Sequence, residues 1–238
     1  MSGISNRFAL RGVALAALLA AGATAAAANV LVVRSSGPSA GGYPPGRSLP
    51  DNARIQLRAG DTLVVLDSRG TRTFRGPGNF TASGSARSGP QTVQGNNGRR
   101  ARIGAVRNAG IVPTATPTTI WDIDATQSGT MCLAATTGAR LWRPDASQAA
   151  TLTISGSNRP TQTVIWPAGA ATVDWPAAMP ITNGAEYQLS LTGSPVPARI
   201  RMRTLASRPE DIQAVAQALI EQGCREQLDL LVDTAPSL

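Results

Sequence analysis

The side chains that most often perform acid–base or covalent chemistry are missing from this chain. All 22 basic residues are arginines, and neither histidine nor lysine occurs among the 238 residues. Without imidazole there is no Ser-His or Cys-His couple, and without lysine there is no Schiff base or Ser-Lys dyad. We therefore expect no catalytic, cofactor-binding or metal-binding residues, and we predict a non-enzymatic protein.

Asp122 and Asp124 form a pair of carboxylates on a strand predicted over 119–124. Side chains two positions apart in a strand share a face and lie about 7 Å apart along it. Such a pair could serve glycoside hydrolysis or bind a hard cation. Because nothing nearby supplies the rest of either site, two solvated carboxylates beside a sheet are the favoured interpretation.

Arginines form two candidate contact surfaces for an anionic partner. Arg199, Arg201 and Arg203 alternate with other residues, so a strand would place all three guanidinium groups on one face. A second group lies in a Gly/Ser/Pro-rich segment and comprises Arg99, Arg100, Arg102 and Arg107. Anionic lipid, acidic polysaccharide or an acidic protein could meet either group. Nucleic acid is not expected, because the chain has few aromatic residues to stack on bases.

Residues 41–48 have the spacing of a phosphate-binding loop, with Arg47 in the place of the usual lysine. Pro44 and Pro45 remove two backbone N–H donors, and Leu49-Pro50 follows instead of a helix. An ordinary loop is therefore expected.

The first 28 residues resemble a secretory signal peptide. Arg7 and Arg11 precede an apolar run that ends in four alanines, with cleavage expected near Ala28. A retained N-terminal anchor is the alternative. We predict a periplasmic protein, and in that oxidising compartment Cys132 and Cys224 are expected to form one disulfide, with two buried free thiols as the alternative.

The segment 29–82 predicts a small antiparallel β-roll. Its short alternating or β-branched runs are separated by Gly-bearing turns, in the order Leu57-Arg58-Ala59-Gly60-Asp61-Thr62-Leu63-Val64-Val65, Gly70-Thr71-Arg72-Thr73-Phe74 and Gly76-Pro77-Gly78-Asn79-Phe80. This pattern resembles the periplasmic FecR-type domain. Well-known members of that family are membrane-tethered signal relays with a cytoplasmic end that controls a sigma factor. This chain has a signal peptide in place of that end, so only the β-domain is implied.

The rest of the chain is predicted to hold a linker, a second β unit and a helical end. Residues 83–118 resemble a flexible Gly/Ser/Arg/Pro-rich linker, and 119–206 carry seven or eight short strands that indicate a β-sandwich-like domain. Ser207-Arg208-Pro209-Glu210 predicts a helix start, Gly223 a helix end, and 207–234 a C-terminal helical segment. The cysteine pair would then fasten this segment to the second strand of the sandwich.

Charge is divided unevenly between the two halves. Residues 29–107 hold 12 arginines and three acids, whereas 108–238 hold eight arginines and 11 acids. If the protein holds an acidic surface, we therefore expect it to do so through its first half. Together with the strand patterns, the sequence predicts a mainly β envelope protein that acts through protein–protein contacts in periplasmic sensing or scaffolding, with a membrane-bound sensor as one candidate partner. The alternative is a carbohydrate-active or glycan-binding protein that uses Asp122, Asp124 and exposed tryptophans.

Overall fold

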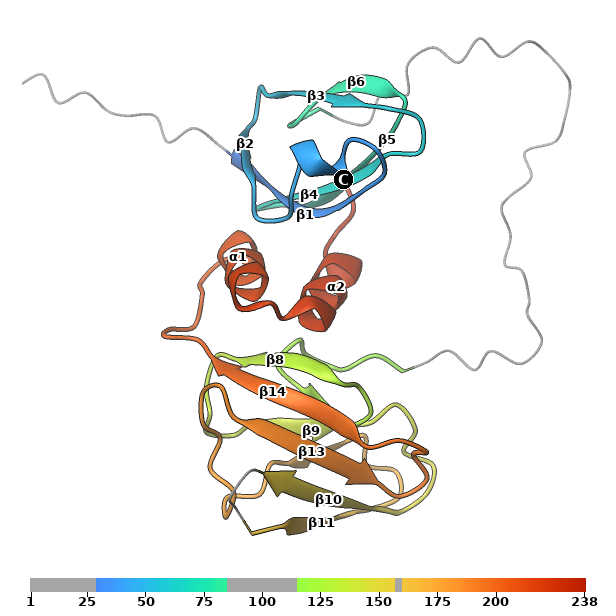
Figure 1. Ribbon diagram of the computed structural model, residues 1–238, viewed down its shortest axis with the longest axis vertical. Helices are drawn as coiled ribbons and strands as arrows, with labels where there is room; N and C mark the ends of the chain where they lie inside the picture. Colours follow the sequence, from blue (N-terminus) through green and yellow to red (C-terminus); the bar gives the residue numbers. More distant parts are fainter. Residues whose placement is uncertain (1–28, 85–114, 157–159) are drawn as a thin grey trace, which may run out of the picture.

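The computed structural model describes residues 29–84, 115–156 and 160–238, and these form three tiers stacked along one axis (Figure 1). A first β unit lies at one end and a second β unit at the other. A pair of C-terminal helices lies between them. The predicted mainly β fold with a helical end is confirmed. The predicted signal peptide and most of the predicted linker lie outside the described residues.

The first unit, residues 29–84, consists of a four-stranded and a two-stranded antiparallel sheet. The larger sheet has the order β2-β1-β4-β5, with bounds Ser48–Pro50, Asn29–Ser36, Thr62–Asp67 and Gly70–Arg75. The smaller sheet pairs β3 (Arg54–Leu57) with β6 (Gly78–Thr81). The strands predicted for the β-roll all occur; β1 continues three residues beyond the predicted run 30–33, and β2 lies in the loop predicted before residue 53.

The two central strands of the first unit are buried on both faces. Val30 and Val32 of β1 pack with Leu63 and Val65 of β4 toward the small sheet. The intervening side chains of the same strands pack instead against the helices; they are Leu31, Val33, Val64 and Leu66. A strand covered on both sides must be apolar at successive positions, which explains the unbroken apolar runs of β1 and β4.

The second unit, residues 115–204, is a sandwich of two mixed sheets. The five-stranded sheet has the order β11-β10-β13-β14-β8, with bounds Gln162–Trp166, Ala150–Gly156, Glu186–Leu191, Ala198–Thr204 and Gly129–Leu133. The three-stranded sheet has the order β12-β9-β7, with bounds Thr172–Asp174, Arg140–Trp142 and Ile123–Asp124. The β8–β14 and β7–β9 pairs are parallel, and the other pairs are antiparallel. One apolar core joins the inner faces of the two sheets.

The helix layer consists of α1 (Ile212–Gln222) and α2 (Arg225–Thr234). Gly223 ends α1 in the left-handed conformation, as predicted. The predicted start at Ser207 is wrong: Asp211 is the N-cap, and its carboxylate accepts a hydrogen bond from Ala214 N at 2.7 Å. A start at Ile212 places the apolar stripe of α1 against the first unit, with Ala216 and Leu219 fully buried.

The helix layer is fastened to the second unit by the predicted disulfide, which is confirmed. Cys132 on β8 and Cys224, between the two helices, are bonded and fully buried. The buried amide of Gln227 accepts from Cys132 N at 2.6 Å and donates to the carbonyl oxygens of Cys132 and Ile120 at 2.8 and 2.6 Å. This amide completes the backbone hydrogen bonds of β8 at the edge of its sheet.

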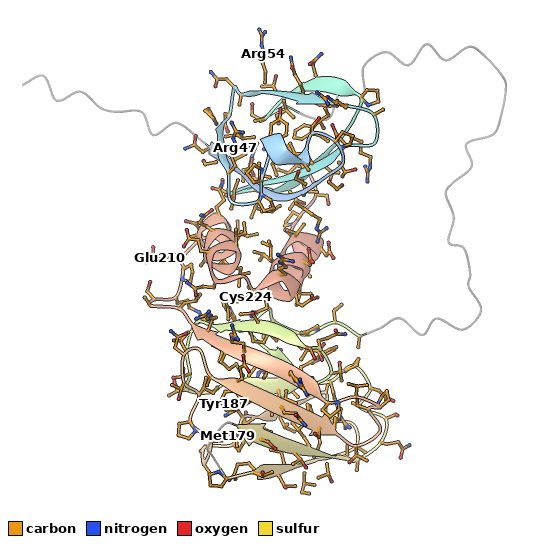
Figure 2. The ribbon with its side chains drawn as sticks, viewed as in Figure 1. Arg47, Arg54, Met179, Tyr187, Glu210 and Cys224 are labelled. Carbon is orange, nitrogen blue, oxygen red and sulfur yellow. A yellow bond between two sulfur atoms is a disulfide. The ribbon has the colours of Figure 1, made fainter. Side chains whose placement is uncertain are left out.

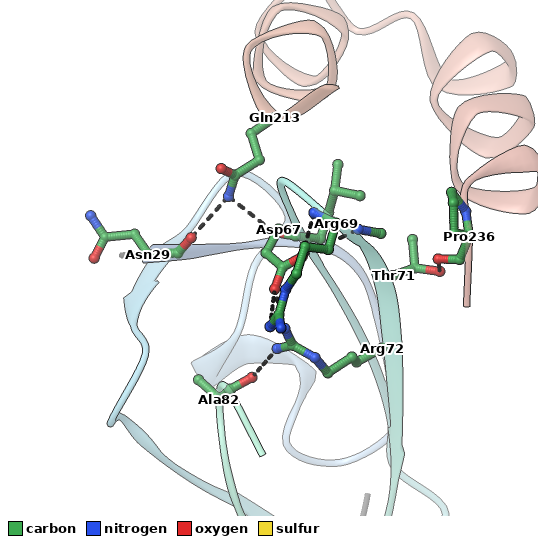
Figure 3. A network of polar contacts seen from close by, with 10 residues as sticks. Asn29, Asp67, Arg69, Thr71, Arg72, Ala82, Gln213 and Pro236 are labelled. Atoms are coloured by element: carbon green, nitrogen blue, oxygen red, sulfur yellow. Dashed lines mark hydrogen bonds and ion pairs between the residues drawn. The ribbon is translucent and has the colours of Figure 1, made fainter. Parts of the chain in front are cut away.

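The helix layer is fastened to the first unit by side chains and by the C-terminal tail (Figure 3). The Gln213 amide donates to the carbonyl oxygens of Asn29 and Leu66 at 2.9 and 3.1 Å. Beyond α2, Thr71 N donates to Pro236 O at 2.8 Å, and Leu238 N donates to Thr71 O at 3.0 Å. The tail therefore extends the sheet beyond β5, and the carboxyl end of the chain holds its amino-terminal unit.

No helix within 29–84, 115–156 and 160–238 is long and apolar enough to cross a membrane.

Candidate functional site

The strongest candidate contact surface is the outer face of the five-stranded sheet. Along β14 the inward residues Ile200 and Met202 are buried, whereas Arg199 and Arg201 are exposed. The neighbouring strands β10 and β13 alternate in the same way. Such alternation is typical of a sheet with one face on the core and one face open to water.

A hollow of about 530 Å³ crosses this face from β10 to β8. The strand register explains it. Tyr187 and Ile200 lie opposite each other and point into the core, and the same row ends in Gly156 and Gly129, which have no side chains. The floor of the hollow is therefore backbone.

Polar side chains form the two walls of the hollow. One wall follows the cross-strand row Ser155, Gln188 and Arg199, and the other follows the row Glu186, Arg201 and Thr130. Hydroxyl, amide and guanidinium groups together can donate to and accept from a peptide segment. The hollow is thus suited to polar recognition of a partner rather than to burial of an apolar ligand.

The charges on this face are only partly neutralised. Arg201 forms an ion pair with Glu186 directly across from it, and both side chains are more than half exposed. The guanidinium of Arg199, among the described residues, has no acidic partner. The exposed Arg201–Glu186 pair contributes little to stability. Because Arg199 has no acidic partner among the described residues, its guanidinium is available to meet an anionic group.

Arg203 lies on the same face of β14 as Arg199 and Arg201, as predicted, but it does not line the hollow. It lies opposite Cys132 on β8, where the helix layer approaches the sheet, and it is partly buried. In the described part of the chain, its Nε is a buried side-chain nitrogen without a hydrogen-bond partner. The open surface therefore contains Arg199 and Arg201 but not the whole predicted triad.

The predicted carboxylate pair is not built as the sequence indicated. Residues 119–122 form a turn and β7 begins only at Ile123, so Asp122 and Asp124 do not lie on one strand. Asp122 is only 3% exposed; its carboxylate accepts from Arg140 at 2.8 Å and from Thr119 N at 3.2 Å. The interpretation of two solvated carboxylates is therefore wrong for Asp122, whose charge Arg140 neutralises.

Asp124 has a local structural role. Its carboxylate accepts from Thr126 N and Thr126 Oγ1 at 2.8 and 2.6 Å, which closes the turn after β7. Both aspartates and Glu226 border a cavity of about 220 Å³ between β8 and α2. Within the described ranges no three acidic, cysteine or histidine residues are grouped so that they could hold a metal ion.

The expected exposed tryptophans are buried. Trp142, Trp166 and Trp175 are each less than a tenth exposed, and the indole N–H groups of the last two donate to Ala170 O and Met179 O. Trp121 is partly buried against the helix layer. The premise of an exposed tryptophan surface is therefore wrong, because proline-bounded strand ends carry these rings into the core.

The remaining predicted contacts, Arg99, Arg100, Arg102 and Arg107, lie outside the described residues. Sequence reasoning also missed residues that the structure places in the hollow, chiefly Ser155, Gln188 and Thr130. Their outward positions were readable from strand alternation, but the strand order that brings them beside Arg199 was not. A comparison of the chain with known family models, curated proteins and solved structures found no match to any of the three.

Proposed function

We propose that this chain is a non-enzymatic exported envelope protein that acts through protein–protein contacts, in periplasmic sensing or scaffolding. The observation that carries the proposal is the hollowed polar face around Arg199, held on a rigid sheet and open to solvent. The predicted signal peptide and the disulfide agree with an exported chain.

The way the three tiers are joined supports a scaffolding role. The helix layer shares an apolar cluster with the first unit and a disulfide with the second, so the two β units are held at a fixed separation. The contact face belongs to the second unit, in which β8 lies nearest the helices and β14 and β13 lie beyond it (Figure 1). A partner bound there would leave the first unit free for a different contact.

The strand order of the first unit supports the inferred resemblance to the FecR-type domain. Strands β3, β4, β5 and β6 occur in the expected order with glycine-bearing turns between them. We infer that this unit serves as the β-domain of a periplasmic sensor or of a scaffold beside one, and that an acidic partner protein docks on the second unit.

A site-specific cross-linking experiment tests the proposal. A photo-reactive residue replaces Gln188 in the hollow, and the exported chain is irradiated in cells of its own host. We expect a covalent adduct with one envelope protein, identified by mass spectrometry, which Arg199→Glu abolishes.

Two matched controls make the result decisive. Arg208→Glu reverses an exposed charge outside the hollow and should leave the adduct intact, and a photo-reactive residue at Glu210 should give no such adduct. The proposal is overturned if position 188 yields no protein adduct, or if Arg208→Glu reduces it as much as Arg199→Glu.

A further inference from the structure

A second hollow of about 530 Å³ lies on the first unit and is lined by three arginines, Arg47, Arg54 and Arg58. The loop that connects β1 and β2 forms one side, and the start and end of β3 form the other. The polar side chains that line it are Ser39, Tyr43, Arg47, Ser48, Arg54 and Arg58. Arg54 projects from the far side of the first unit, away from the helices, and Arg47 lies on the same unit (Figure 2).

The loop that forms this hollow is fixed by short-range contacts. A 3₁₀ turn, η1 (Ala40–Gly42), leads to Tyr43, whose hydroxyl accepts from Gln56 N at 3.0 Å. Arg47 lies over the Tyr43 ring, 5.9 Å from its centre, and donates to the Gly42 carbonyl. The phosphate-loop spacing of residues 41–48 thus belongs to a loop that the ring of Tyr43 and the side chain of Arg47 hold in place.

The carboxylate of Asp61, which lies close to Arg58, is engaged inside the fold. Asp61 is only 2% exposed, and its two oxygens accept from Ser39 N and Arg58 N at 2.9 and 2.5 Å. Burial by itself raises the pKa of Asp61, but these hydrogen bonds and the charge of Arg58 outweigh it, so the pKa lies below its usual value. Asp61 therefore stays ionised while its oxygens serve the backbone of the loop.

The first unit is consequently rich in exposed positive charge. Residues 29–84 contain seven arginines and three aspartates. Arg34 pairs with the helix layer, and Arg69 and Arg72 pair with Asp67. Arg47, Arg54 and Arg58 are exposed around the hollow, and within the described ranges none of them forms an ion pair.

We propose that this hollow binds an acidic polysaccharide, with carboxylate groups of successive uronic acid residues on Arg47, Arg54 and Arg58. Guanidinium groups pair with carboxylates through two parallel hydrogen bonds. The Ser48 hydroxyl and the backbone of Gly41 offer hydrogen bonds to sugar hydroxyl groups. The open, polar lining suits a chain laid across it.

Two other anionic partners fit less well. A membrane surface would gain from large apolar side chains that insert, but those exposed in the described residues are Ile165, Val196 and Leu238, and none of them lines the hollow. A single-stranded nucleic acid would need an open ring for base stacking, whereas the face of Tyr43 is occupied by Arg47.

Binding of polygalacturonate to the purified exported protein tests the inference, measured by calorimetry at low salt. The variant Arg47→Gln/Arg54→Gln/Arg58→Gln should lose about tenfold or more in affinity, because three charged contacts disappear. The control Arg75→Gln/Arg208→Gln/Arg225→Gln removes the same charge from exposed positions outside this hollow and outside the hollow around Arg199, and its affinity should stay within about twofold of wild type.

A second variant and a second probe keep the result unambiguous. Arg54→Gln/Arg58→Gln leaves the Arg47–Tyr43 contact in place, so a folded protein with weakened binding isolates the effect of the charges. The inference is overturned if polygalacturonate does not bind, if both triple variants weaken it equally, or if phosphatidylglycerol vesicles bind more tightly than the polysaccharide. Because the hollow lies on a different unit from Arg199, either result leaves the cross-linking test of the proposed function independent.

Discussion

Removal of the disulfide should cost this protein several kcal/mol of stability without altering its folded contacts elsewhere. The perturbation is Cys132→Ala/Cys224→Ala, which deletes the bridge and leaves no free thiol, because these are the two cysteines of the chain. Both positions are buried beside apolar side chains of the helix layer, where alanine is accommodated.

The magnitude follows from the length of chain that the bridge closes. The two cysteines are 92 positions apart. In the chain-entropy account, a loop of this length restricts the unfolded ensemble by about 4.5 kcal/mol near room temperature. With a urea dependence of about 2–3 kcal/mol per molar, the unfolding midpoint should fall by about 2 M.

The assay follows urea unfolding by two probes that report on different tiers. All four tryptophans lie between residues 121 and 175, so tryptophan fluorescence reports on the second unit, whereas far-UV circular dichroism reports on the whole fold. Wild type treated with a reductant serves as the matched comparison and should move toward the variant.

A small effect would refute this reasoning. A midpoint shift below about 0.3 M, with both probes unchanged, would mean that the apolar cluster and the Gln227 amide already join the helix layer to β8 without help from the bridge. A shift seen by circular dichroism alone would place the effect in the helix layer rather than in global unfolding.

Three further outcomes follow from the buried contacts. Leu219→Ala should lower the free energy of unfolding by about 3 kcal/mol in urea titrations, because it empties a fully buried position between α1 and the first unit. Arg72→Met should cost about 3 kcal/mol, because it leaves the buried Asp67 without the Arg72 guanidinium, whereas Arg69→Met, at a side chain 68% exposed, should cost less than about 1 kcal/mol; equal losses would contradict this. Burial raises the pKa of Asp67, but hydrogen bonds from Arg69 and the charges of Arg72 and Arg69 lower it overall, and the pKa of Asp61 is lowered too. The stability that these two ionised carboxylates contribute to the folded protein should therefore be complete above about pH 5 and disappear as the pH falls below about 4. Unfolding midpoints measured across this range would show the loss, and Asp67→Asn should make it shallower.

Local pattern predicted the strands well, because each carries its own periodicity. The alternation of Arg199, Ile200 and Arg201 indicates which side chains face the core, and this does not depend on which other strands pair with β14. The same holds for Gly223, whose left-handed conformation ends α1 through contacts within a few residues.

Prediction failed where two local signals competed or where a distant element decided. Ser207 and Asp211 are both acceptable helix caps. The structure uses Asp211, because a helix that starts after it packs Ile212, Ala216 and Leu219 on the first unit. Asp122 was expected in a strand with its carboxylate in solvent, but Arg140, 18 residues away, draws that carboxylate into a buried ion pair.

The candidate site shows the same division. Arg199 and Arg201 could be found from sequence, but their neighbours Gln188, Ser155 and Thr130 come from three other strands. Likewise, no residue near Arg47 indicates that β3 brings Arg54 and Arg58 to the same hollow. Strand order determines these neighbourhoods, and strand order depends on long-range pairing.

Residue types and short sequence periods were enough to predict the mainly β class, the outward face of β14, the pairing of the two cysteines and the excess of arginine in the first half of the chain. Each of these features depends on residue type or on a period of a few residues. Residue type gives the charge, and the period tells which side chains of an element are exposed. The position of the C-terminal helices, between the two β units and against the second face of β1 and β4, follows from long-range packing and could not be read from the sequence. An unbroken apolar run requires a cover on both faces, but it does not specify the cover, because burial depends on apolar area and not on which segment supplies it.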